Sequence, residues 1–404
     1  MTQFIPALQR TQNLFDLYQY ICGKSEVPAV FNFWSSVAML AATLENRVWY
    51  EKHKGEKLYP HLYVMLVGAG GLGKGTAISQ AVRIAKSSIN IQTYRGKLTC
   101  AHLIDVLGKA EKDEFDRKVV KNPRLWLLMD ELKNDVGSHK QLAEEFVAMM
   151  TELYTATNYT INTGTRTSGE IDIVDPLVNW MAGTTEAWLR MVLTKDLVDS
   201  GFTARTCFIF GKYDFNKRYP RIVYPPDYDE VMEHIQLRLW MIQQFEGRIL
   251  MTEQAESIVD QWYMMRPAPT EEAWYSMWHR HHDMMLKFAM INCLADPGPP
   301  VINASHMLKA KAMVRQIVRF TSRLLEVAHE TYATKPSNEI ASYLEVKGSD
   351  WSGHSDMLRY FRSKRGMDSK QVKDAVFQLI AEGSVEVERT ATGKTSYRWR
   401  EVVA

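Results

Sequence analysis

"HLYVMLVGAGGLGKGTA" occupies residues 61–77 and decides the fold class that we expect. Residues 61–67 form a continuous apolar run with aromatic and β-branched members, which is typical of a parallel strand buried on both faces. Gly68 to Lys74 then follow the pattern GxxxxGK, and an amphipathic helix is expected over 76–88. A glycine-rich loop between a strand and a helix is the setting in which this pattern binds phosphates. The stretch therefore predicts a P-loop in an α/β fold.

The loop predicts a site for ATP. Its glycines allow backbone N–H groups to face the phosphates, and the following helix directs its positive end at the same anion. Lys74 adds a mobile cation. The residues expected to bind the nucleotide are Gly68, Gly70, Gly71, Leu72, Gly73, Lys74, Gly75, Thr76 and Ala77.

A second apolar run, "LWLLMDE" at 125–131, ends in two carboxylates. Asp130 is expected to hold Mg²⁺, directly or through water, and Glu131 is expected to orient and deprotonate an attacking water molecule. A phosphate loop combined with such an acidic strand end predicts ATP hydrolysis, with Lys74 and Glu131 as catalytic residues.

Gly75 departs from the usual pattern, because a Ser or Thr hydroxyl normally follows the P-loop lysine and binds Mg²⁺. Thr76 comes one residue later, and we expect Thr76 or an ordered water molecule to complete the metal shell. The GKGT ending also resembles the loop of adenylate kinases, so phosphoryl transfer to a small molecule is the competing prediction. The neighbouring Asp130-Glu131 pair favours hydrolysis instead.

Elsewhere, strands alternate with helices in a pattern that predicts a parallel sheet followed by a helical segment. "NYTINTGTRTSGEIDIV" at 158–174 predicts a β-hairpin, because two β-rich runs flank a glycine-containing turn. The charged stretch 109–122 is interpreted as a solvated loop or helix face. Further helices are expected at 8–22, 28–44, 100–110 and 140–155, and further strands at 47–53, 89–95, 177–185 and 205–211.

The C-terminal segment predicts a winged helix. Helices are expected at 338–346, 353–363 and 368–382, followed by a hairpin over 384–400. Winged helices usually place the third helix in the major groove of DNA and the hairpin along its backbone. A role in protein contact is the alternative. The expected DNA contacts are Lys370, Lys373, Arg389 and Lys394.

Four stretches, "LYPHLYVMLVGAGGLGKGTA", "LLMDE", "NWMAGTTEAWL" and "SGFTAR", occur in this order. With them the chain resembles the AAA+ helicase-like ATPases of phages and other mobile elements. More distantly it is similar to viral origin helicases and minichromosome maintenance helicases. The resemblance covers roughly residues 28–330, and the winged tail agrees with it.

The resemblance implies roles for further residues. Thr184 would hold the lytic water as the first sensor, with Thr185 and Asn179 as weaker candidates. Arg205, just before an apolar strand, would reach the γ-phosphate of a neighbouring subunit and stabilise transition-state charge. Arg280 is the candidate for the second sensor.

The resemblance also gives the hairpin a role, because in those helicases such a hairpin enters the central pore of a ring and grips DNA. Arg166, near the turn, would contact a phosphate. His279, His282 and Asp283 have a spacing that could bind a metal ion. A solvated or capping histidine cluster explains them better, since no further ligand motif accompanies them.

Composition sets wider bounds. The chain has 404 residues and a net charge of +2, so a nucleic-acid partner must meet a local basic surface. Its four cysteines form no CxxC pair, which fits a reducing cytoplasm. The N-terminal residues lack the features of a signal peptide, and 27–44 suits a buried helix better than a membrane span. We expect an N-terminal helical segment at 1–55, a P-loop AAA+ core at 56–215, a helical lid at 216–334 and the winged helix at 335–404.

We therefore expect a ring, a hexamer of identical chains, that couples ATP hydrolysis to movement along DNA. A replicative helicase of a phage or mobile element is the predicted setting. Two alternatives stay open: a small-molecule phosphotransferase, and a DNA-binding ATPase that does not translocate, such as a loader or a defence or regulatory switch.

Overall fold

The structure of the chain is a computed structural model with two compact units, Met1–Ser322 and Arg323–Ala404. The boundary falls inside helix α14 (Ala304–Tyr332), before the expected limit at 334. The residues that the structure describes are 13–114, 117–136, 140–155, 158–162, 170–192, 201–266, 269, 275–332, 340, 341, 343, 344, 347, 350–365, 367–381, 385–389 and 394–399.

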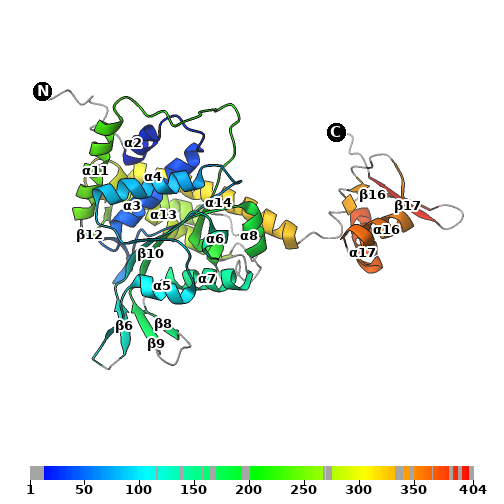
Figure 1. Cartoon of the computed structure of the whole chain (residues 1–404), viewed down its shortest axis with the longest axis horizontal. Helices are drawn as coiled ribbons and strands as arrows, with labels where there is room; N and C mark the ends of the chain where they lie inside the picture. Colours follow the sequence, from blue (N-terminus) through cyan, green and yellow to red (C-terminus); the bar gives the residue numbers. More distant parts are fainter. Residues whose placement is uncertain are drawn as a thin grey trace. The chain divides into compact units, whose positions relative to one another are not determined.

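The first unit is built on a five-stranded parallel sheet in the order β11-β3-β10-β7-β4. Its middle strand, β10, is labelled in Figure 1. Every residue of β3 and of β10 is buried, as expected for parallel strands covered on both faces. The predicted α/β class is confirmed. The strands are β3 (Tyr63–Val67), β4 (Thr93–Arg95), β7 (Arg124–Met129), β10 (Leu177–Thr184) and β11 (Thr206–Phe210).

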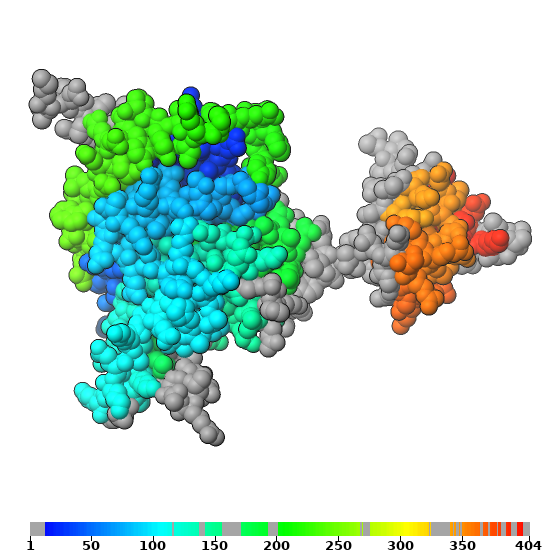
Figure 2. Space-filling view, viewed as in Figure 1, coloured from blue at the N-terminus to red at the C-terminus, as the bar shows by residue number. Residues whose placement is uncertain are grey.

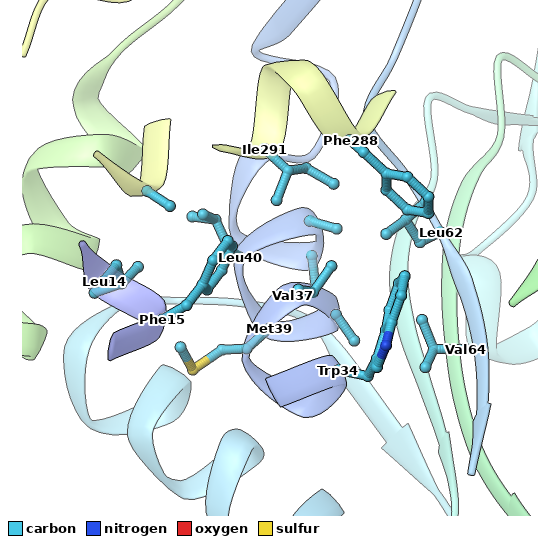
Figure 3. Close-up of a cluster of buried hydrophobic side chains, with 14 of the residues drawn as sticks. Leu14, Phe15, Trp34, Val37, Met39, Leu40, Leu62, Val64, Phe288 and Ile291 are labelled. Carbon is cyan, nitrogen blue, oxygen red and sulfur yellow. The ribbon is translucent and has the colours of Figure 1, made fainter. Parts of the chain in front are cut away.

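Successive residues of β3 point to opposite faces of the sheet, and each face meets its own layer of helices. On one face, Val64 belongs to the same buried cluster as Trp34 and Phe288 (Figure 3). On the other face, Tyr63 packs edge-on against Trp180, whose ring also meets Phe146. The helices up to β11 are α2 (Leu14–Ile21), α3 (Ala29–Leu44), α4 (Lys74–Ser88), α5 (Cys100–Leu107), α6 (Leu132–Asp135), α7 (Lys140–Leu153), α8 (Glu186–Val192) and α10 (Phe202–Arg205).

A second, four-stranded sheet has the order β5-β6-β9-β8. It includes the predicted hairpin, because β8 (Asn158–Asn162) and β9 (Glu170–Val174) pair in antiparallel register. The prediction of a loop or helix face at 109–122 is wrong: β5 (Glu111–Lys112) and β6 (Lys118–Lys121) are strands, and β6 pairs with β9. Val119 and Val120 are buried there, and the strands project from the unit at the lower left of Figure 2.

The helices after β11 pack on the same core as the N-terminal helices. One buried cluster contains Leu14, Trp34, Phe288 and Ile317, so the segments expected at 1–55 and 216–334 share a core with the sheet. Among the described helices, none is long and apolar enough to cross a membrane. The later helices are α11 (Tyr228–Gln244), α12 (Glu253–Met265), α13 (Tyr275–Ala295) and α14. Short strands are β1 (Val48–His53), β2 (Glu56–Leu58), β12 (Gly247–Arg248), β13 (Leu250–Met251) and β14 (Val301–Ile302).

Among the described residues of the second unit, two complete helices accompany a three-stranded antiparallel sheet in the order β15-β17-β16. The helices and the hairpin lie where the sequence predicts them. The first expected helix, at 338–346, is only partly described, and Ile340 and Leu344 from it are buried in the unit's core. The elements are β15 (Ser352–Gly353), α16 (His354–Arg365), α17 (Ser369–Ala381), β16 (Val385–Arg389) and β17 (Thr395–Trp399).

Replacing Trp34 with alanine should destabilise the first unit strongly. Trp34 is fully buried, its ring lies 5.4 Å from that of Phe288, and its Nε1 donates to Oε1 of Gln316 at 3.0 Å. The loss leaves a cavity between α3, α13 and α14, so we expect the free energy of unfolding to fall by about 3–5 kcal/mol. Urea unfolding followed by circular dichroism measures it.

Trp240→Ala is the matched control, because Trp240 is 51% exposed. It should change the free energy of unfolding by roughly 0.5 kcal/mol or less. Equal losses in the two variants would contradict the assignment of Trp34 to the core.

Candidate active site

A glycine-rich loop, residues 68–73, joins the carboxyl end of β3 to α4. Gly71 and Gly73 both have φ of 78°, a left-handed conformation that strains other residues. Lys74 opens α4, and its Nζ donates to the carbonyl oxygens of Gly68 at 2.8 Å and of Ala69 at 2.7 Å. Burial lowers the pKa of Lys74, and the nearby Glu131 carboxylate opposes that shift. The loop thus holds a partly desolvated amine over its own backbone.

The two acidic residues follow β7 at the same edge of the sheet. A Cβ atom added at Gly75 would lie 3.7 Å from Oδ1 of Asp130, so position 75 faces this carboxylate. Glu131 precedes α6, and Asn134 Nδ2 donates to its Oε2 at 3.2 Å. Lys74 and the acidic pair therefore meet although the sequence separates them.

Arg95 is a site residue that sequence reasoning missed. It ends β4, and its guanidinium donates to both carboxylate oxygens of Asp130, from Nε to Oδ2 at 2.8 Å and from Nη2 to Oδ1 at 2.6 Å. Nη2 also donates to Oγ of Ser79 on α4 at 2.8 Å. In the sequence, Arg95 is distinguished only as a cation at the end of a short strand. Its contact with Asp130 forms because β4 pairs with β7.

Thr184, Thr185 and Asn179, the three candidates expected near the first-sensor position, have different contacts in the structure. Thr184 is 1% exposed, and its Oγ1 has no hydrogen-bond partner in the described part of the chain. Its carbonyl accepts from N–H of Gly68 at 3.1 Å, which places it beside the loop. Thr185 instead caps α8, accepting from N–H of Trp188 at 3.2 Å. Asn179 accepts from N–H of Leu62 near the other end of the strand.

A cavity of about 260 Å³ lies on the other side of the loop. Thr76 lines it with Val27 and Ile222, whereas Gly75 faces Asp130. Tyr213 also borders this cavity, and its hydroxyl donates to the carbonyl of Gly70 at 2.5 Å. This cavity therefore offers room for part of a ligand next to the glycine-rich loop.

Arg205 and Arg280 lie at the opposite, amino edge of the sheet. Arg205 directly precedes β11, whose first residue pairs with Tyr63, the first residue of β3. Its Nη1 donates to the carbonyl of Gly201 at 2.9 Å. Burial, and next the charge of Arg280, lower the pKa of Arg205 to about 10. Since the glycine-rich loop follows the last residue of β3, neither arginine is presented to the loop of its own chain.

The histidine cluster on α13 is engaged by neighbouring charges. Asp283 pairs with Lys52 at 2.9 Å, and Nδ1 of His282 lies 3.6 Å from its carboxylate. Among the described residues, no group of three or more His, Cys, Asp or Glu side chains is placed to hold a metal ion. Arg166 lies outside the described residues.

Three of the four residues predicted to contact DNA in the second unit are exposed. Lys370 and Lys373 are exposed on α17, while Val372 and Val376 on the same helix are buried, as expected. Lys394 is exposed before β17, and Arg389 ends β16.

A scan against protein-family models finds no match to the chain, and a search of curated proteins finds none either.

Gly183→Ala should destabilise the first unit at the site. A Cβ atom there would lie 2.4 Å from the carbonyl oxygen of Asp130 and 3.3 Å from Cβ of Lys74, so the strand ends must move apart. We expect a loss of about 1–3 kcal/mol in the free energy of unfolding, measured in urea. Gly70→Ala is the control, because nothing lies within 4 Å of a Cβ atom at that position. Unchanged stability of Gly183→Ala would show that the strand ends are not in close contact.

Proposed function

We propose that the protein is a ring-forming AAA+ ATPase that couples ATP hydrolysis to movement along DNA, as a replicative helicase of a phage or mobile element. The observation that carries this proposal is the meeting of Lys74, Asp130, Glu131 and Thr184 at one edge of the parallel sheet. These four residues come from three strand ends that lie side by side in the order β3-β10-β7.

Each of these residues has a chemical role in hydrolysis. Lys74 can leave the loop carbonyls to bind the β- and γ-phosphates. Glu131 accepts a proton from the attacking water, and the buried hydroxyl of Thr184 orients that water. Asp130 would hold Mg²⁺, which would neutralise charge on the phosphates.

The positions of Gly75 and Thr76 indicate which group would complete the Mg²⁺ shell. The position that normally carries the hydroxyl faces Asp130, and Thr76 lines the cavity on the other side of the loop. We therefore favour an ordered water molecule, rather than the Thr76 hydroxyl, as the group that completes the metal shell.

Arg205 supports a shared site between neighbouring chains. Four residue steps separate the two ends of β3, which is roughly 13 Å along the strand at ~3.3 Å per residue. An arginine at the amino edge is therefore available to the nucleotide of the next subunit and not to its own. Arg280 lies on the same side of the sheet, away from the glycine-rich loop of its own chain.

DNA contact is proposed at two places. The β8–β9 hairpin stands beside β5 and β6, whose stretch carries exposed Lys109, Lys112 and Lys121. In the second unit, which we propose to be a winged helix, α17 presents Lys370 and Lys373 with Phe377, which is 75% exposed, one turn further. Lysines bind phosphates, and an exposed aromatic ring can stack on a base.

Glu131→Gln should bind ATP and fail to hydrolyse it, because the variant keeps the size of the side chain and removes the base. We expect turnover to fall by about 10²–10⁴-fold. Lys74→Ala should lose both ATP binding and turnover. Phosphate release and the fluorescence of a labelled ATP analogue measure the two steps.

Glu253→Gln and Lys86→Ala are matched controls on exposed helix surfaces, Glu253 on α12 and Lys86 near the far end of α4. Undiminished hydrolysis by Glu131→Gln would remove Glu131 from the mechanism. Formation of a nucleoside diphosphate from an added monophosphate acceptor would favour the phosphotransferase alternative.

Arg205→Ala should bind ATP and assemble, yet lose about 10³-fold or more in turnover if it supplies the transition-state cation. An equal mixture with Lys74→Ala should partly recover activity. In a random ring, about a quarter of the interfaces then pair an intact Lys74 with an intact Arg205. Phosphate release is measured against each variant alone.

Particle size with ATP and single-stranded DNA is the companion measurement. A single-chain particle under all conditions, or no recovery in the mixture, would contradict a shared site. DNA-stimulated hydrolysis without strand separation would favour the non-translocating alternative.

A further inference from the structure

A second cavity, of about 460 Å³, lies at the amino edge of the central sheet. It is bounded by residues that precede or begin the strands, among them His61, Arg124 and Leu177, and by α13. The P-loop follows the opposite ends of the same strands, so this cavity is separate from the nucleotide site of the chain.

The cavity is lined by the carboxylates of Glu56, Asp175 and Asp283 and by four cationic side chains without an ion pair in the described part of the chain. These cations are Lys57, Arg124, Arg280 and Lys287. Arg124 donates only to the carbonyl oxygens of Pro123 and Asp175. Two of the carboxylates at the cavity, those of Glu56 and Asp283, are bound to Lys52.

Lys287 is the most buried of these cations, with 2% of its surface exposed. Its Nζ donates to the hydroxyl of Tyr154 at 2.8 Å and to the carbonyl of His61 at 3.0 Å. Burial is the main cause that lowers the pKa of Lys287 to about 7; the Asp283 carboxylate opposes this shift, and the charge of Arg280 adds to it. Cations held close together out of water repel one another, and an anion between them would relieve this repulsion.

The remaining lining suits a ligand with an organic part. Tyr59, Tyr154 and Met284 supply aromatic and apolar surface, and Asn46 and Asn122 supply amides. Nδ1 of His61 is buried without a hydrogen-bond partner in the described part of the chain. Volumes of roughly 300–1,000 Å³ are typical of small-molecule sites, and a terminal phosphate alone would leave most of this cavity empty.

We infer that the cavity binds a small phosphate ester, held by Arg124, Arg280 and Lys287, on each chain by itself. The cavity borders Asn122 and Asp175, which directly follow β6 and β9. A bound ligand is therefore placed at the root of the four-stranded sheet. This inference does not rest on the proposed ATPase activity.

Calorimetric titration of the Lys74→Ala chain with AMP and with pyrophosphate tests the inference, because this background removes the P-loop lysine. One equivalent of AMP should bind per chain, in particles of single-chain size, and binding of pyrophosphate without AMP would contradict a site for an ester. Arg280→Gln and Lys287→Met, each added to this background, should weaken binding by about tenfold or more, since each removes a charge-assisted hydrogen bond.

Lys86→Met, on the exposed face of α4, is the control and should leave binding unchanged. Thermal unfolding of each variant shows whether it folds, and Arg280, only partly buried, provides the variant least prone to misfolding. No binding of either probe, or equal binding by all variants, would overturn the inference. Binding confined to assembled particles would also overturn it, because the cations would then serve the ATP of a neighbouring chain.

Discussion

The close contact between β10 and the end of β7 determines the geometry of the candidate site. Gly183 leaves no room for a side chain, because a Cβ atom there would lie 2.4 Å from the carbonyl oxygen of Asp130. The same glycine lies against Lys74, so one small residue brings the acidic strand end and the phosphate loop together. The partner-free hydroxyl of Thr184 follows directly in the chain and lies at the same place.

The ion pair between Arg95 and Asp130 adds a second constraint. Both carboxylate oxygens of Asp130 accept from the guanidinium, so a metal ion at Asp130 would compete with Arg95 for them. The side chains are 41% and 43% exposed, and an exposed ion pair contributes only about 0–1 kcal/mol. Releasing one oxygen to a metal ion therefore costs little. The contact of Arg95 with Ser79 would link such a release to α4.

The two edges of the central sheet have different chemistry. The carboxyl edge combines one lysine with carboxylates and a buried hydroxyl, whereas the amino edge gathers cations that lack anionic partners among the described residues. Parallel strands separate these edges by the length of β3, and the four-stranded sheet begins at the amino edge. We propose that ATP is hydrolysed at the carboxyl edge of the sheet and that the small phosphate ester binds at the amino edge of the same sheet.

The sequence by itself determined the local elements: the apolar run of β3, the glycine loop and α4, the acidic end of β7, and the hairpin at 158–174. Each of these depends on the spacing of apolar residues, glycines and charges within a short stretch. The tertiary structure alone decided the strand order, the contact of Arg95 with Asp130 across 35 residues, and the strands at 111–121. Those strands are charged and short, and they form because β6 pairs with the distant β9. The gathering of cations around Lys287 has the same origin, since burial and long-range pairing leave no local pattern in the chain.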